Sequence, residues 1–224
     1  MTIDEVVTKL KSEGKEGVRN GWSVIDTQGE ETFGLNFTKI QNVAKTIKND
    51  PCLADELYAS ANHDLKVLAT YIDDPASYSR DDMNKRVEQL YVSPFASKFC
   101  QEVMAKSSHA VHFIDEWSHC EIGDYKCYAY YTLAEVAKQK NNLSREFYAR
   151  HLRDIAERIH EEPDVVKQAM KQALLSIGCR DPKLKAKSYQ VANAIGKIDF
   201  TCGKEVDAVE KLDKKLSVRK MVKS

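Results

Sequence analysis

Two histidines three residues apart have a spacing that could bind a metal ion. His109 and His112 share one face of an expected helix, and such a pair can supply two ligands to zinc. His119 and Cys120 follow, but the chain offers no clear third and fourth ligand in a zinc pattern. We therefore expect histidines that face solvent, and no metal site.

Aromatic residues gather in one later segment and could stack on nucleic-acid bases. The segment contains Tyr125, Tyr128, Tyr130 and Tyr131. Tyr128 and Tyr131 fall on one helix face, and this spacing favours packing in a core. Trp117 is expected to pack between helices, and Trp22 to cover the N-terminal end of the fold.

Charge is divided unevenly along the chain. The 34 basic and 34 acidic side chains cancel overall, but residues 1–136 carry 14 basic and 22 acidic ones. Residues 137–224 carry the other 20 and 12, so the two parts have net charges of −8 and +8. A basic half of this kind can bind phosphate backbones, or its charges can simply solvate helix faces.

The elements that position these residues are helices, and the clearest pattern lies between Ala169 and Lys197. Apolar residues recur at helical spacing before Gly178 and again after Pro182, which predicts two helices with a turn between them. Gly178 is expected to end the first helix, because glycine adopts the left-handed conformation without steric cost. Asp181 is expected to cap the second helix, in which Pro182 suits the first position. Such pairs tend to stack into solenoids.

Similar periodicity predicts helices along the rest of the chain and no strand. Glycine (9) and proline (5) are few, which disfavours a β-rich or disordered chain. We expect an all-α fold, an α-α superhelix or solenoid of helical repeats, in a single domain over residues 1–224. An irregular cap is expected over about 1–34, and a charged C-terminal helix over about 204–224. The other helices are expected at 3–10, 38–47, from 51, and at 63–72, 81–91, 97–106, 109–117, 125–139 and 144–160.

The chain shows no targeting or membrane segment. Its start lacks the apolar core of a signal peptide, and no apolar run is long enough to span a bilayer. The six cysteines are scattered without a Cys-x-x-Cys pair, which favours a reducing compartment. We expect a cytoplasmic protein with no membrane partner.

The chain resembles the bacterial DNA alkylation repair proteins of the AlkD type over about residues 5–205. Four segments carry the resemblance: FGLNFTKIQNVAKTIKND, HDLKVLATYIDDP, YAYYTLAEVAK, and LLSIGCRDPKL followed by ANAIGKIDF. The resemblance implies a C-shaped solenoid of HEAT-like helical pairs whose basic concave face cradles duplex DNA. It also implies removal of N3- and N7-alkylated purines by a carboxylate with flanking tryptophans, without a metal or organic cofactor.

The resemblance also shows a departure at the family's catalytic position. Matching VMAKS to the corresponding helix end places Lys98 where the catalytic aspartate would lie, and Pro94 where an aromatic residue lies one turn earlier. A shift of one residue places Phe99 and Phe95 there instead. Neither alignment supplies a carboxylate.

Other family positions differ as well. Lys126 or Cys127 stands in the region of the family's arginine, and Gln172 or a neighbour stands where a third tryptophan would lie. From their places in or beside the family's DNA-facing segments, we expect a DNA-binding face of four residues. These are Lys98, Lys126, Lys171 and Arg180. The alternative is that these charges are scattered and solvated.

The missing carboxylate matters because excision builds positive charge on the sugar as the glycosidic bond breaks. A carboxylate stabilises that charge and can position water, whereas two like charges about 4 Å apart repel by roughly 4 kcal/mol at an effective dielectric of 20. Asp64, Asp115 or Glu116 could serve as a displaced carboxylate. Alternatively, Lys98 could act as an amine nucleophile if burial lowered its pKa.

We therefore expect a DNA-binding member of the family with a degenerate glycosylase site. Its partner is expected to be double-stranded DNA, contacted through the phosphate backbone by a monomer. One alternative is an active alkylpurine DNA glycosylase, which hydrolyses N-glycosidic bonds. Another is a helical-repeat scaffold that binds protein.

Overall fold

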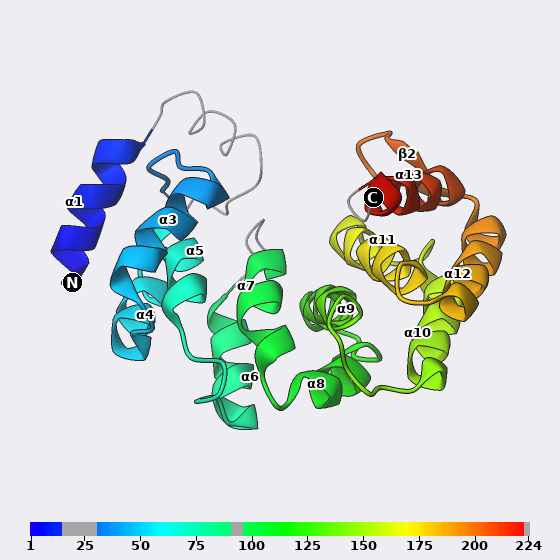
Figure 1. The fold of residues 1–224 in the computed structure, drawn as a ribbon, viewed down its shortest axis with the longest axis horizontal. Coiled ribbons are helices and arrows are strands. Elements are labelled where there is room, and N and C mark those ends of the chain that lie inside the picture. Colours follow the sequence, from blue (N-terminus) through cyan, green and yellow to red (C-terminus); the bar gives the residue numbers. More distant parts are fainter. Residues whose placement is uncertain (15–30, 91–95, 222–224) are drawn as a thin grey trace. The chain divides into compact units, whose positions relative to one another are not determined.

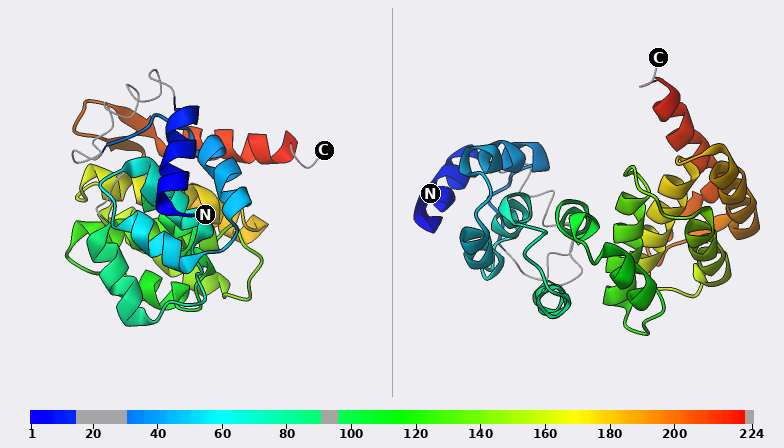
Figure 2. Two further views of the ribbon diagram at one scale, coloured as in Figure 1. Left: turned by 90° about the vertical axis from the view of Figure 1, so that its left-hand side faces the viewer. Right: turned by 60° about the horizontal axis from the view of Figure 1, so that its bottom comes forward.

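The computed structural model describes residues 1–14, 31–90 and 96–221, and most of these residues are helical (Figures 1 and 2). They form two compact units, residues 1–109 and residues 110–224, which we call unit 1 and unit 2. The single repeat domain expected from the sequence stays a prediction. None of the described helices is both long and apolar enough to cross a membrane.

Unit 1 is built around one buried helix, α5. This helix packs against α3, α4 and α7, and nearly all of its residues are buried. Asn36 and Asp50 cap α3 and α4 by accepting from backbone N–H groups, and Pro51 occupies the first turn of α4 as expected. The elements of unit 1 are α1 (Ile3–Glu13), α3 (Phe37–Ile47), α4 (Pro51–Tyr58), α5 (His63–Ile72), α6 (Arg80–Gln89), α7 (Ala96–Glu102) and the 3₁₀ helix η1 (Met104–Lys106).

Unit 2 is a set of longer helices in which α9 and α11 form the central pair. Helix α8 packs on α9, and α12 contacts α10, α11 and α13. The elements of unit 2 are α8 (Ala110–Trp117), α9 (Gly123–Val136), α10 (Arg145–Arg158), α11 (Asp164–Gly178), α12 (Pro182–Ile195), β1 (Lys197–Asp199), β2 (Glu205–Asp207) and α13 (Ala208–Met221).

The helix pair predicted around Gly178 and Pro182 is confirmed. Helix α11 packs against α12, and the Asp181 carboxylate accepts from the backbone N–H groups of Lys183 and Leu184 at 2.8 and 3.0 Å. The role predicted for Gly178 is wrong. This residue is the last one of α11 and has no positive φ.

Gly178 instead permits close helix packing. A Cβ at this position would lie 2.8 Å from Leu212 Cδ1 and 3.1 Å from Ser188 Cβ, so a larger residue would push against both α13 and α12.

The prediction that the chain has no strand is also wrong. Strands β1 and β2 pair antiparallel, with Ile198 opposite Val206 and both side chains buried. Gly203 lies in the connecting turn with φ of +77°. Strands of three residues are too short to show alternation in the sequence, so this hairpin gave no periodic pattern.

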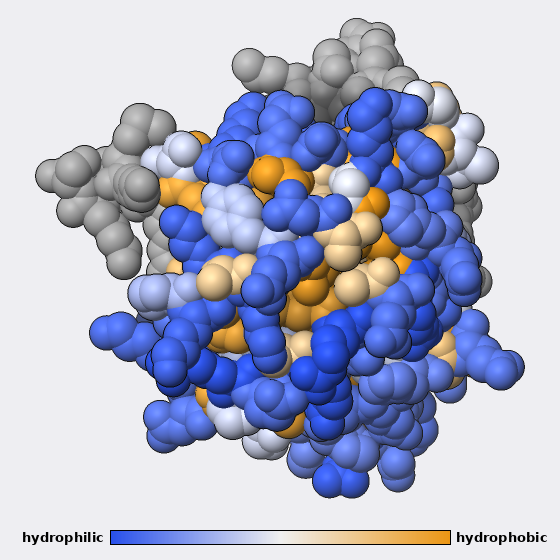
Figure 3. Space-filling view, turned by 90° about the vertical axis from the view of Figure 1, so that its right-hand side faces the viewer, coloured by the Kyte–Doolittle hydropathy of each residue, from blue (hydrophilic) through white to orange (hydrophobic). Residues whose placement is uncertain are grey.

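The surface of the side that carries α12 is mostly hydrophilic. Figure 3 shows charged and polar side chains over most of this side, with apolar ones gathered in a hollow near the middle. This distribution is the usual one for a helical protein that turns its apolar stripes inward.

Candidate nucleic-acid interface

Lys98 lies in α7 of unit 1, where three helices bring two aromatic rings to its ammonium. The Lys98 Nζ atom is 5.5 Å from the ring centroid of Phe37 in α3 and 5.4 Å from that of Tyr71 in α5. It also donates to Gln101 Oε1 at 3.0 Å. Aromatic faces attract a cation, so the two rings and Gln101 hold the lysine side chain against α3 and α5.

The carboxylate beside Lys98 is Glu102, one helical turn further along α7. Its Oε1 atom lies 3.8 Å from Lys98 Nζ, and its Oε2 atom lies 2.7 Å from Lys106 Nζ. Glu102 and Lys106 also act on Tyr71. Burial and the negative charge of Glu102 raise the pKa of Tyr71 to about 12, although the positive charge of Lys106 acts to lower it. Glu102 was not among the predicted site residues; its spacing of four residues from Lys98 on a helix is the sequence signal that indicates the pair.

The carboxylates considered as substitutes have other roles. Asp64 is buried and accepts from the Thr32 hydroxyl and from the backbone N–H groups of Phe33 and Gly34, at 2.9, 2.7 and 3.1 Å. Burial raises the pKa of the Asp64 carboxyl, although these hydrogen bonds act to lower it. Asp115 and Glu116 belong to unit 2.

Asp115 and Glu116 already have partners within unit 2. Asp115 forms an ion pair with Arg150 and approaches His151 at 3.3 Å, and Glu116 lies 3.0 Å from His112. Neither is a carboxylate without a partner.

Lys126 is enclosed within unit 2. Its side chain is 11% exposed and forms an ion pair with Glu162, which is 7% exposed and also accepts from Arg158 Nη2 at 2.9 Å. Breaking such a buried pair to reach a phosphate would leave Glu162 without its closest cation. The DNA contact expected for Lys126 stays a prediction, which this ion pair disfavours.

Arg180 is likewise a structural residue. Its guanidinium donates to the carbonyl oxygens of Ala137, Gln139 and Asn141 at 2.9, 2.8 and 3.1 Å, and to Asn141 Oδ1 at 2.6 Å. It also stacks over the ring of Tyr148 at 4.6 Å. These bonds close the C-terminal end of α9, where unpaired carbonyls favour a cation. These bonds already occupy the guanidinium, and the phosphate contact expected for Arg180 stays a prediction.

Lys171 is the predicted residue with the strongest case for a phosphate contact. Its pKa is lowered by partial burial and by the neighbouring charges of Lys204 and Lys211. The Lys171 Nζ atom donates to Gln168 Oε1 at 2.6 Å and lies 5.5 Å from the ring centroid of Phe200. The β1–β2 turn and α13 thus place Lys204 and Lys211 close enough to Lys171 in α11 to lower its pKa, and none of the three pairs with a carboxylate in the described part of unit 2. We call Lys171, Lys204 and Lys211 the lysine cluster.

The structure shows where the aromatic residues lie and whether histidines could hold a metal. Core packing is confirmed for Tyr128, which is fully buried, and for Trp117, which is buried with its ring centroid 5.0 Å from that of Tyr125. Tyr131, predicted to share the core face of Tyr128, is only half-buried. Among the residues that the structure describes, no group of three His, Cys, Asp or Glu side chains is placed to hold a metal. The expectations for Trp22, Pro94 and Phe95 fall outside the described residues.

Comparison with known proteins agrees with this helical architecture. A family model described as DNA alkylation repair enzyme matches residues 6–188. The chain is also similar to a solved protein of a family described as new, related to the HEAT-like repeat DNA glycosylases and having affinity for branched DNA structures. The TM-score is 0.89 at 22% identity, over 98% of this chain and 95% of that one. A comparison with curated proteins finds no match. The structural likeness confirms the all-α, HEAT-like repeat fold.

Proposed function

Since the chain belongs to the DNA alkylation repair enzyme family, we propose that it binds DNA through phosphate contacts and does not excise alkylated bases. The observation that carries the binding proposal is the lysine cluster of unit 2. Lys204 and Lys211 contribute to lowering the pKa of Lys171, so the positive charge gathered there gains by neutralisation, and a phosphate backbone supplies regularly spaced negative charge.

Branched DNA is the form of DNA that we propose as the preferred ligand. The similar solved protein has affinity for branched DNA structures, and its fold is shared over nearly the whole of this chain. A branched molecule presents several backbones close together, so a protein that reads phosphates gains contacts on it without reading sequence.

The geometry around Lys98 supports the absence of excision. A glycosylase needs a carboxylate that faces the positive charge developing on the sugar. Glu102 is the acid beside Lys98, and its charge is already shared between Lys98 and Lys106. An incoming sugar would therefore meet a lysine ammonium beside a neutralised acid.

Binding and excision assays with matched variants test this proposal. Lys171→Gln/Lys211→Gln should weaken binding to a fluorescent four-way junction by about tenfold or more, the effect of losing charged hydrogen bonds worth roughly 1.5–3 kcal/mol. Lys183→Gln/Lys187→Gln removes the same charge from exposed positions of α12 and should change affinity much less. Release of 7-methylguanine from duplex DNA should stay at background. Equal losses in the two double variants would refute the cluster, and robust base release would refute the absence of excision.

A further inference from the structure

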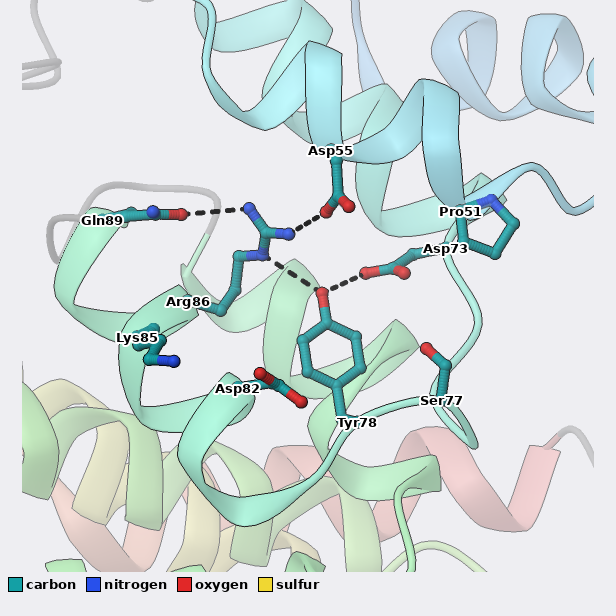
Figure 4. Close-up of a pocket in the computed structure, with 9 residues that line it drawn as sticks. All are labelled: Pro51, Asp55, Asp73, Ser77, Tyr78, Asp82, Lys85, Arg86 and Gln89. Atoms are coloured by element: carbon teal, nitrogen blue, oxygen red, sulfur yellow. Dashed lines mark hydrogen bonds and ion pairs between the residues drawn. The ribbon is translucent and has the colours of Figure 1, made fainter.

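A second basic site lies in unit 1, around Arg86 of α6 (Figure 4). The guanidinium carbon of Arg86 is 4.2 Å from the ring centroid of Tyr58, its Nε donates to the Tyr78 hydroxyl at 3.1 Å, and its Nη1 donates to Gln89 Oε1 at 3.1 Å. Its remaining partner is Asp55, through an ion pair. The Arg86 side chain is 13% exposed, whereas that of Asp55 is 68% exposed. The cation is thus built into the fold, and its carboxylate partner stands in solvent.

Two cavities share Arg86, Asp55 and Gln89 as a common wall. The first has a volume of about 310 Å³ and is also lined by Asp73 and Asp82, with Lys85 as a second cation. The second has a volume of about 560 Å³ and is lined on its other sides by Tyr58, Ala59, Ser60 and Lys66. Of the described residues that line the second cavity, two are cations, Arg86 and Lys66, and one is an acid, Asp55.

The other acids near Arg86 are committed to the fold. Asp73 accepts from the hydroxyls of Tyr58 and Tyr78 at 3.0 and 2.8 Å, and burial raises its pKa. Asp82 is bonded to Ser79 in the cap of α6. Among the described residues, the partner of the Asp55 carboxylate is Arg86. Asp55 is thus the carboxylate that can leave.

We propose that the second cavity binds a phosphate group, with Arg86 and Lys66 as its cations and Asp55 as a placeholder that moves out when the phosphate enters. An arginine fork matches two phosphate oxygens at once, and a lysine adds a point charge. The residues involved all belong to unit 1, so this site is separate from the lysine cluster of unit 2. The phosphate can come from DNA, which rests on the proposed function, or from free phosphate in solution.

Titration of the ¹⁵N-labelled full chain with inorganic phosphate tests the cavity itself. We expect amide shifts at the α4–α5 turn and at the C-terminal end of α6. Asp55→Asn should tighten phosphate binding about two- to fivefold, the range that an exposed ion pair can contribute. The matched control is Glu56→Gln, which removes the same charge from the next exposed residue of α4 and should leave binding unchanged. Lys66→Met should weaken binding about tenfold or more.

The outcome that overturns the proposal is equally specific. Equal phosphate affinity in Asp55→Asn and Glu56→Gln, or shifts confined to the lysine cluster, would exclude the second cavity as a site. Because Asp55 is exposed, its replacement is expected to leave the fold intact, so this comparison decides the matter even if Lys66→Met does not fold.

Titrations with DNA identify the source of the phosphate. A duplex with 5′-phosphate ends, the same duplex with 5′-hydroxyl ends, and inorganic phosphate are compared in the Asp55→Asn and Glu56→Gln chains. Tighter DNA binding in Asp55→Asn alone indicates a DNA phosphate, and a response to inorganic phosphate alone indicates a free one. DNA binding that depends on the lysine cluster but not on Asp55 or Lys66 would overturn this site and leave the proposed function standing.

Discussion

Replacing Arg180 distinguishes a residue that holds the fold from one that contacts DNA. Its guanidinium makes four hydrogen bonds to residues 137–141 and stacks on Tyr148. Hydrogen bonds from a charged donor are worth roughly 1.5–3 kcal/mol each, and an exposed cation–π contact about 0.5–1 kcal/mol. Because bonds from one group are not additive and Arg180 is half-buried, we expect Arg180→Ala to lower the free energy of unfolding by about 2–4 kcal/mol.

Urea unfolding followed by far-UV circular dichroism measures this loss. Arg180→Lys keeps the charge but cannot form the fork, so it should recover less than half of the lost stability while binding a DNA junction as the unaltered chain does. Lys183→Ala, at an exposed position of α12, should change stability by less than about 0.5 kcal/mol. An Arg180→Ala chain of unaltered stability, together with a large fall in DNA affinity for Arg180→Lys, would show that the clamp is the wrong description.

Three further perturbations test other parts of the structure. Gly178→Ala should lower the unfolding free energy by about 1–3 kcal/mol, because the added Cβ crowds Leu212 and Ser188; a neutral or stabilising result in urea unfolding would contradict that packing. His63 has its pKa lowered to about 4, chiefly by burial, so the unfolded chain, with a pKa near 6.5, binds the proton more readily. Stability should therefore be complete above about pH 6.5 and fall as the pH drops toward 4, and a His63→Gln chain with the same acid profile would exclude this residue as the cause. Lys98→Asp should not release 7-methylguanine above background, since Glu102 and Lys106 remain beside it; substantial release would show that one acid is enough.

The helical architecture could be predicted because each helix is specified by residues close together in the sequence. Apolar stripes at helical spacing identified α11 and α12, and Asp181 and Pro182 marked the start of α12. The β1–β2 hairpin was not predicted, because a strand of three residues shows no periodic pattern of apolar side chains. The packing role of Gly178 was not predicted either, because it depends on α13, which begins 30 residues later in the sequence.

The surroundings of the candidate site residues could not be predicted from the sequence, because burial and partners are not local. Lys126 and Arg180 were expected to face DNA, which stays a prediction; their intramolecular partners Glu162 and Gln139 lie 36 and 41 residues away along the chain. Lys171 was predicted from its place in or beside a segment that resembles the family's DNA-facing ones. Lys204 and Lys211 join it only because the hairpin and α13 fold back toward α11, which no spacing in the sequence reveals.

The salt dependence of junction binding tests the central claim most directly. Fluorescence anisotropy titrations at several salt concentrations compare the unaltered chain with Lys171→Gln/Lys204→Gln/Lys211→Gln. Each phosphate contact contributes a slope of about −0.9 in log affinity against log salt, so losing up to three contacts should make the slope shallower by about 1–3. Two results would contradict DNA binding through this cluster. One is an affinity of the unaltered chain that does not change with salt concentration, and the other is a triple variant with the same slope and affinity as the unaltered chain.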